Sequence, residues 1–189
     1  IDKKNETNVG HRESPACALW LDNGTIITAS TDIIIWDDRH FKEIKRLEGH
    51  AWKIKYLAVF NNNKYLVSVA HCIKVWDLDT GKEITSFIGH NNKEIYSVAV
   101  SLDEKHLMTG DKDGKIKVWD LNALVTTKRI IGHTDRVRSI AVSPGNRLVA
   151  TASSDKTAII WDVNKGQPLF YLKKHEDLSS QILCWCNRN

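Results

Sequence analysis

The sequence predicts an all-β protein made of four consecutive repeats and the start of a fifth. Three observations carry this prediction: Trp-Asp recurs every 40 to 43 residues, Gly-His recurs every 39 to 43 residues, and short β-branched and aromatic runs lie between turn residues. The tryptophans of Trp-Asp are Trp36, Trp76, Trp119 and Trp161, and the histidines of Gly-His are His11, His50, His90 and His133. Two dipeptides that keep one period and one order indicate a structural repeat.

Each repeat is expected to hold four strands. In the fourth repeat the β-branched and aromatic runs place them at about residues 138–142, 148–152, 158–162 and 168–172. Turn-forming Gly, Asn, Asp and Pro residues separate such runs, as at residues 22–24, 61–63, 113–114 and 144–146. No segment longer than about two turns has helical periodicity, so the chain is interpreted as all-β.

The same dipeptides divide the chain. Residues 1–9 form an N-terminal segment, and the repeats span residues 10–49, 50–89, 90–132 and 133–174. Residues 175–189 begin a fifth repeat, because Lys174-His175 keeps the phase of Gly-His with Lys in place of Gly.

This pattern resembles the WD40 family, whose repeats run from Gly-His to Trp-Asp and form the four-stranded blades of a β-propeller. The resemblance covers residues 10–189. It implies four four-stranded blades plus the first strand of a fifth, as part of a larger ring of seven or eight blades. Two alternatives stay open: association with another half-propeller, and closure of the four blades alone.

The family also implies a hydrogen-bonded tetrad in each blade, made of the Gly-His histidine, a Ser or Thr, a turn Asp and the Trp-Asp tryptophan. Carried over by position, the sets are His11, Thr28, Asp32 and Trp36; His50, Ser68 and Trp76; His90, Thr109, Asp113 and Trp119; and His133, Thr151, Asp155 and Trp161. The hydroxyl residue lies eight positions before Trp in the first two repeats and ten in the others. A turn two residues shorter is therefore expected there. Cys72 takes the acidic position in repeat two, so water or backbone is expected to complete that set and the second blade to be less rigid.

Composition and cysteine usage narrow the function classes. The net charge of +4 and the apolar share of 42% are ordinary for a globular protein, and no apolar run approaches a membrane span. The four cysteines are too scattered for a disulfide framework, which favours a reducing compartment, cytoplasmic or nuclear. The Ser/Thr–His–Asp sets recur with the repeat and include an indole, so we interpret them as structural. Neither a catalytic residue, a cofactor nor a metal site is predicted.

Cationic residues gather where the first strand of each blade begins and in the turn between the second and third strands. These loops share the propeller face on which WD40 proteins most often bind partners. The residues expected to bind a partner are Lys53, Lys55, Tyr96, Lys112, Arg136 and Arg138. They suit an acidic or phosphorylated peptide, with Trp52 among them. The alternative is that these cations only solvate exposed loops.

The leading functional hypothesis is a non-catalytic scaffold that binds a protein or peptide on a propeller rim within a multiprotein complex. The alternative is a substrate-recognition or sensor module of a larger enzyme or signalling protein, for example a ubiquitin-ligase receptor. Nucleic acid is a weaker candidate, because the positive charge is spread out and is not interleaved with stacking aromatics.

Overall fold

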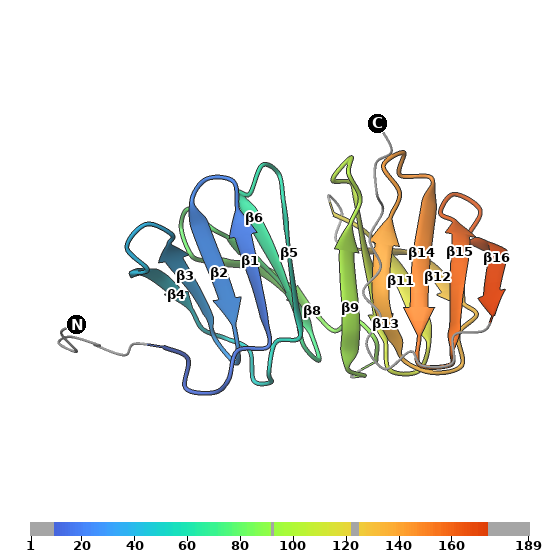
Figure 1. Cartoon of the computed structure of the whole chain (residues 1–189), viewed down its shortest axis with the longest axis horizontal. Coiled ribbons are helices and arrows are strands. Elements are labelled where there is room, and N and C mark those ends of the chain that lie inside the picture. The colour runs from blue at the N-terminus through green and yellow to red at the C-terminus, as the bar shows by residue number, and fades with distance from the viewer. Residues whose placement is uncertain (1–9, 92, 122–124, 174–189) are drawn as a thin grey trace.

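The computed structural model describes residues 10–91, 93–121 and 125–173 (Figure 1). In these ranges it contains four antiparallel four-stranded sheets and no helix, which confirms the all-β prediction. Each sheet takes four consecutive strands in chain order, and we call the sheets the first to fourth blades. The described residues include no helix that is long and apolar enough to cross a membrane.

The bounds of the strands are as follows. The first blade consists of β1 (Cys17–Leu21), β2 (Thr25–Ala29), β3 (Ile33–Asp37) and β4 (Glu43–Leu47). The second consists of β5 (Tyr56–Phe60), β6 (Tyr65–Val69), β7 (Ile73–Asp77) and β8 (Glu83–Phe87). The third consists of β9 (Ile95–Val100), β10 (His106–Asp111), β11 (Lys115–Asp120) and β12 (Val125–Ile131). The fourth consists of β13 (Val137–Val142), β14 (Leu148–Ser153), β15 (Thr157–Asp162) and β16 (Gln167–Lys173).

The strands of the fourth blade match the predicted ranges to within one residue at either end. The strand expected at the start of a fifth repeat lies outside the described residues.

The blades stack through their first strands. β1 contacts β5, β5 contacts β9, and β9 contacts β13, so these strands lie on the inner side of the arrangement. In Figure 1 the first two blades form one half of the molecule and the last two form the other, with β5 and β9 where the halves meet. This succession of sheets is the arrangement of propeller blades, in which each sheet buries its faces against its neighbours.

An apolar core lies between each pair of consecutive blades, and a tryptophan anchors it. Trp76 packs with first-blade residues, Trp119 with second-blade residues and Trp161 with third-blade residues. Their exposed fractions are 2%, 4% and 0%. Each indole therefore points toward the preceding blade. Burying an indole removes a large apolar area from water, so these three side chains hold the stack together.

The glycine of Gly-His makes room for this packing. A Cβ atom on Gly132 would lie 2.4 Å from Cη2 of Trp161. No real Cβ approaches a ring carbon so closely, so only glycine fits without displacing the indole. The glycine of Gly-His and the tryptophan of Trp-Asp are thus in direct contact in the fourth blade.

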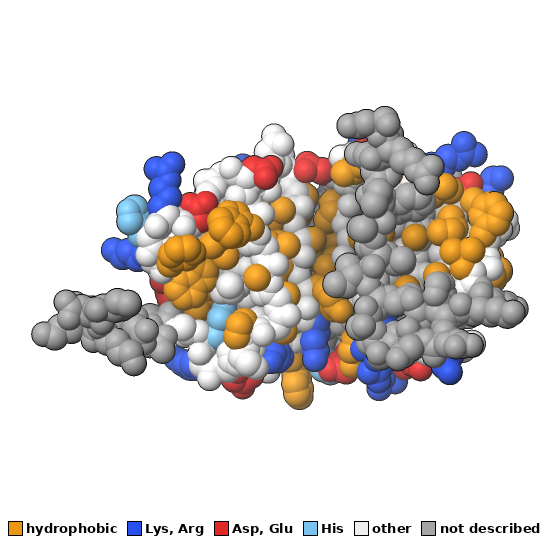
Figure 2. Space-filling model, in the orientation of Figure 1, with side chains coloured by type: hydrophobic (Ala, Val, Ile, Leu, Met, Phe, Trp, Pro, Cys, Tyr) orange, Lys and Arg blue, Asp and Glu red, His pale blue; other side chains and the backbone are white. Residues whose placement is uncertain are grey.

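The two outermost faces of the stack remain apolar. On the first blade, Trp20 and Trp36 share the face turned away from the second blade, and Trp20 is 68% exposed. On the last strand of the fourth blade, Phe170 is 63% exposed. Figure 2 shows hydrophobic side chains gathered over β1–β3 and over β15–β16. The total number of blades in a closed ring stays a prediction.

The turns between second and third strands differ in length between the halves of the molecule. In the first blade Ala29 pairs with Ile33, which leaves three residues in the turn. In the fourth blade Ala152 pairs with Ala158, which leaves five. These turns lie at the lower edge of the molecule in Figure 1, together with the connections between blades. We call this edge the lower rim.

Candidate functional site

The fourth blade contains a complete hydrogen-bonded tetrad. The indole of Trp161 donates to Thr151 Oγ1 at 2.8 Å, and the same hydroxyl lies 2.8 Å from Nε2 of His133. Nδ1 of His133 lies 2.9 Å from the carboxylate of Asp155. Because a carboxylate can only accept, Nδ1 carries the proton and Nε2 accepts from the threonine. Thr151 is fully buried, so its hydroxyl has no open approach for a substrate and acts as a strut.

The third blade uses a different acid from the one expected. Nδ1 of His90 lies 2.9 Å from Asp111, and the prediction that Asp113 completes this tetrad is wrong. Asp113 lies in the exposed turn, where its carboxylate is 3.4 Å from Lys93 Nζ. The other oxygen of Asp111 accepts from the backbone N–H groups of Asp113 and Lys115, so the turn holds this carboxylate beside the histidine. The remaining contacts of the third tetrad are as expected, from His90 Nε2 to Thr109 Oγ1 at 2.8 Å and from Trp119 to Thr109 at 2.9 Å.

The first blade contains the expected four residues despite its shorter turn. Nδ1 of His11 lies 2.5 Å from the carboxylate of Asp32, and Nε2 of the same ring lies 2.7 Å from Thr28 Oγ1. The indole of Trp36 donates to this hydroxyl at 2.7 Å. Arg46 binds the second oxygen of Asp32. The short turn can therefore hold a carboxylate against the histidine.

The second blade contains a thiol where the other blades have a carboxylate. His50 Nε2 lies 2.6 Å from Ser68 Oγ, which also accepts from Trp76 at 2.8 Å. Cys72 Sγ lies 3.7 Å from Nδ1 of His50, in the position where water or backbone was expected. Burial lowers the pKa of His50 to about 4, and the positive charge of Lys74 adds to the effect. Burial also raises the pKa of Cys72, so thiol and imidazole are both neutral at pH 7.

The lower rim brings four of the six predicted partner-binding residues together around one aromatic ring. Arg136 Cζ lies 4.9 Å from the centre of the Tyr96 ring, Arg138 Cζ lies 6.0 Å from it, and Lys55 Nζ lies 6.0 Å from it. These residues start the first strands of the second, third and fourth blades, which the stacking places side by side. Cations within about 6 Å of a ring face are attracted to its electrons. We call these four residues the Tyr96 cluster.

The Tyr96 cluster is held in place by its neighbours. Nε of Arg138 donates to Ser154 Oγ at 2.8 Å, from the turn between β14 and β15. The hydroxyl of Tyr96 donates to Glu94 at 2.8 Å. Burial and this hydrogen bond raise the pKa of Tyr96, so its hydroxyl stays protonated at pH 7.

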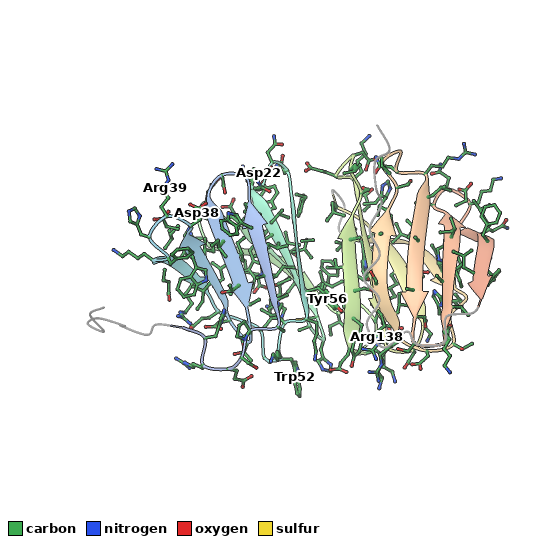
Figure 3. The ribbon with its side chains drawn as sticks, in the orientation of Figure 1. Asp22, Asp38, Arg39, Trp52, Tyr56 and Arg138 are labelled. Carbon is green, nitrogen blue, oxygen red and sulfur yellow. The ribbon has the colours of Figure 1, made fainter. Side chains whose placement is uncertain are left out.

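A second aromatic residue extends the surface toward the second blade. Trp52, which is 59% exposed, contacts His71 with ring centres 4.8 Å apart. Nε2 of His71 lies 3.8 Å from Glu94. A line of contacts therefore runs from Trp52 through His71 and Glu94 to Tyr96. Figure 3 shows Trp52 and Arg138 on the lower rim, opposite Asp22, Asp38 and Arg39 on the upper edge.

The other two predicted residues lie outside the cluster. Lys53 Nζ donates to Ser14 Oγ at 3.0 Å, at the edge of the first blade. Lys112 is exposed, and its charge acts on Glu94 and not on the tyrosine ring. Glu94 and His71 occupy a strand-entry position and a turn position of the same face, but neither was among the six residues predicted to bind a partner. The loop positions of both residues were readable from the repeat, but their contacts with Tyr96 and Trp52 depend on neighbouring blades.

The cations of the Tyr96 cluster differ from Arg46 and Lys74, which form ion pairs with carboxylates. Arg46 pairs with Asp32 and Glu43, and Lys74 lies 2.6 Å from Glu83. Among the described residues, no carboxylate lies within 4 Å of the charged groups of Lys55, Arg136 or Arg138. Three like charges near one ring repel one another, and an anion placed among them would relieve that repulsion.

The described residues contain no group of three or more His, Cys, Asp or Glu side chains placed to hold a metal ion. The aromatic and cationic lower rim can offer apolar contact, cation–π contact and hydrogen bonds to an anion. These are binding interactions, and all three occur within one patch.

Comparison with known proteins agrees with the fold. The family described as WD domain, G-beta repeat matches residues 41–77, 81–120 and 124–162, and the chain belongs to this family. It is 26% identical over 172 residues to Autophagy-related protein 16 of Arabidopsis thaliana, covering 88% of this chain and 33% of the relative. It is 26% identical over 183 residues to Nuclear distribution protein nudF of Aspergillus niger, covering 83% of this chain and 41% of the relative.

A third relative is the B-type cell cycle switch protein ccs52B of Medicago truncatula, 26% identical over 193 residues, which cover 94% of this chain and 37% of the relative. The chain thus spans about a third to two fifths of the length of these curated relatives. Membership of the WD-repeat family supports a role as a protein-interaction module.

Proposed function

We propose that this chain is a non-catalytic scaffold module that binds an anionic segment of a partner protein on its lower rim. The observation that carries the proposal is the Tyr96 cluster, in which three cations without a carboxylate partner among the described residues converge on one ring. Exposed Trp52 supplies an apolar anchor beside it. Because partner binding by a rigid scaffold needs pre-placed side chains, the bond from Arg138 to Ser154 supports the same assignment.

The length of the relatives supports one variant of this proposal. The chain matches only part of each relative, so the module could serve as the recognition or sensor portion of a larger enzyme or signalling protein. The lower rim would bind the partner in either case, as a scaffold or as part of a larger protein. We place this task in the cytoplasm or the nucleus.

Affinity capture tests the proposed function. The chain with Arg136→Glu and Arg138→Glu should lose bound partner proteins that the unaltered chain retains, because charge reversal repels an anion. The matched control carries Lys82→Glu and Lys165→Glu, two exposed lysines in turns of the opposite edge. Circular dichroism and thermal unfolding check that both variants fold.

Quantitative mass spectrometry compares the captured proteins. The proposal predicts a set of proteins that the unaltered chain and the control retain and that the rim variant loses. Identical sets for the rim variant and the control would contradict it.

A further inference from the structure

The charges of the lower rim separate into two sides. Glu94 accepts a hydrogen bond from Tyr96, and this bond lowers the pKa of Glu94, with further lowering by the charges of Lys55, His71 and Lys112. The two arginines lie near the Tyr96 ring, and among the described residues neither forms an ion pair with Glu94. The carboxylate of Glu94 therefore offsets the lysine side of the surface, while the arginine side has no carboxylate within ion-pair distance among the described residues.

The arginine side has donors placed for an oxyanion. Arg138 uses Nε for its bond to Ser154, and its Nη groups donate to none of the described residues. Arg136 lies closer to the same ring, at 4.9 Å. Both guanidinium groups lie against the same ring, at 4.9 Å and 6.0 Å from its centre, so one oxyanion bound beside that ring lies near both. A planar fork matches the oxygens of a phosphate in a bidentate fashion, and three phosphate oxygens can serve two forks at once.

The charge balance also favours a doubly charged anion. Lys55, Arg136 and Arg138 carry three positive charges and Glu94 carries one negative charge, and Lys112 adds a further positive charge near Glu94, so at least two positive charges remain. A phosphate monoester carries about −1.5 to −2 at pH 7. A carboxylate would leave a positive charge uncompensated and would repeat the charge that Glu94 already supplies.

We propose that the lower rim binds a phosphorylated side chain of its partner, and that the negative charge of Glu94 lowers the affinity for anions so far that a single carboxylate binds only weakly. The proposal rests on the proposed function and names its partner chemistry. Coulomb energy scales with the charge of the incoming anion, so a dianion gains about twice what a carboxylate gains. The negative charge of Glu94, held beside the ring by the Tyr96 hydroxyl, reduces the attraction for either anion, and the dianion, with twice the charge, remains the more strongly bound.

Titration of the full chain with two small probes tests this inference. The probes are N-acetyl-O-phosphoserine N-methylamide and N-acetyl-glutamate N-methylamide, followed by NMR at the Arg138 Nε–H and the Trp52 indole N–H. The unaltered chain should bind the phosphoserine probe at least about tenfold more tightly than the glutamate probe. Because the second pKa of the phosphate is about 6, phosphoserine affinity should fall as pH drops from 7 to 5.

Two variants isolate the part played by Glu94. Glu94→Gln should tighten the glutamate probe by about fivefold and the phosphoserine probe by more, because the lost repulsion scales with the charge of the anion, and it should bring glutamate binding into the measurable range. Glu104→Gln removes one negative charge from an exposed turn between β9 and β10 and should change neither affinity. Equal affinity of the unaltered chain for both probes, or a Glu94→Gln variant that behaves like the Glu104→Gln control, would overturn the inference.

The phosphate assignment and the proposed function can fail separately, and the two experiments distinguish these cases. If the phosphoserine probe does not bind but charge reversal at Arg136 and Arg138 still removes partner proteins, the rim binds an anion of another kind and only the phosphate assignment is lost. If charge reversal leaves the captured proteins unchanged, the proposed function fails first.

Discussion

The second and fourth blades contain the same histidine, hydroxyl and indole chain, but they differ in what faces the far side of the histidine. In the fourth blade, Asp155 binds the ring of His133 and also accepts from the backbone of Thr134 and from Thr157. In the second blade, Cys72 offers one long contact of 3.7 Å to His50. The tryptophans of both blades are almost fully buried, at 2% for Trp76 and 0% for Trp161.

This difference separates two tasks of the tetrad. The indole packs against the preceding blade and donates to the buried hydroxyl, and both interactions are present in the second and in the fourth blade. The carboxylate instead fixes the turn and favours the charged form of the histidine. Burial lowers the pKa of both histidines, but a hydrogen bond and the charge of Asp155 oppose the lowering at His133. Among the described residues no carboxylate hydrogen-bonds the ring of His50, and Glu83 opposes the lowering only through its charge. The second blade is thus folded like the fourth and is more sensitive to acid.

The largest expected effect is the pH dependence at His50. Its folded-state pKa of about 4 is below the ordinary value of 6.5, so the unfolded chain takes up the proton first. Stability is therefore complete above pH 6.5 and is lost as pH falls from 6.5 to 4, by on the order of 3 kcal/mol for this shift. NMR titration of the His50 ring measures the pKa directly. Titration near 6.5 would contradict the prediction, and urea unfolding of His50→Gln should show a shallower loss over the same range.

A smaller effect is expected from removing the group that faces each histidine. Asp155→Ala should lower the free energy of unfolding by about 1–3 kcal/mol, because the buried ring of His133 and the Thr134 N–H lose their acceptor. Cys72→Ala should cost under about 1 kcal/mol, since only one weak contact is lost. Chemical unfolding at pH 7 measures both. Equal costs would show that the thiol serves the second blade as well as the carboxylate serves the fourth.

The smallest effect is a gain of stability. Cys72→Asp should raise the pKa of His50 and stabilise the chain by about 0.5–1 kcal/mol at pH 7, because the first blade shows that a turn of this length holds Asp32 against His11. The gain should grow as pH falls below 6.5. Thermal unfolding at pH 7 and pH 5 measures it, with Cys17→Ala as a control for thiol removal. A less stable variant at both pH values would show that the carboxylate is not tolerated beside Lys74 and Glu83.

The sequence predicted the composition of most tetrads but not the acid of the third. Asp113 occupies the position of Asp155 when the repeats are aligned, and this alignment led to the wrong residue. Asp111 lies at the position of Ser153 in the fourth blade, reaches Nδ1 of His90 and accepts from the backbone N–H groups of Asp113 and Lys115. The third repeat therefore has two acids close to the histidine, and spacing within one repeat does not decide between them.

The lower rim shows a similar limit. The repeat placed Lys55, Tyr96, Arg136 and Arg138 at the start of successive first strands, and this was enough to predict a shared face. Their convergence on one ring depends on the spacing of three blades. The hydrogen bonds that join Glu94 to Tyr96 and Ser154 to Arg138 became visible only in the structure.

The sequence by itself determined the repeat and the strands, because periodic apolar residues and turn residues act over a few positions of the chain. Tertiary structure decided which carboxylate meets each histidine and which charges meet at Tyr96. The histidine–carboxylate contacts join residues 21 or 22 positions apart in the chain, and the contacts at Tyr96 join successive blades about 40 residues apart. The distances in both sets are set by the packing of strands and sheets.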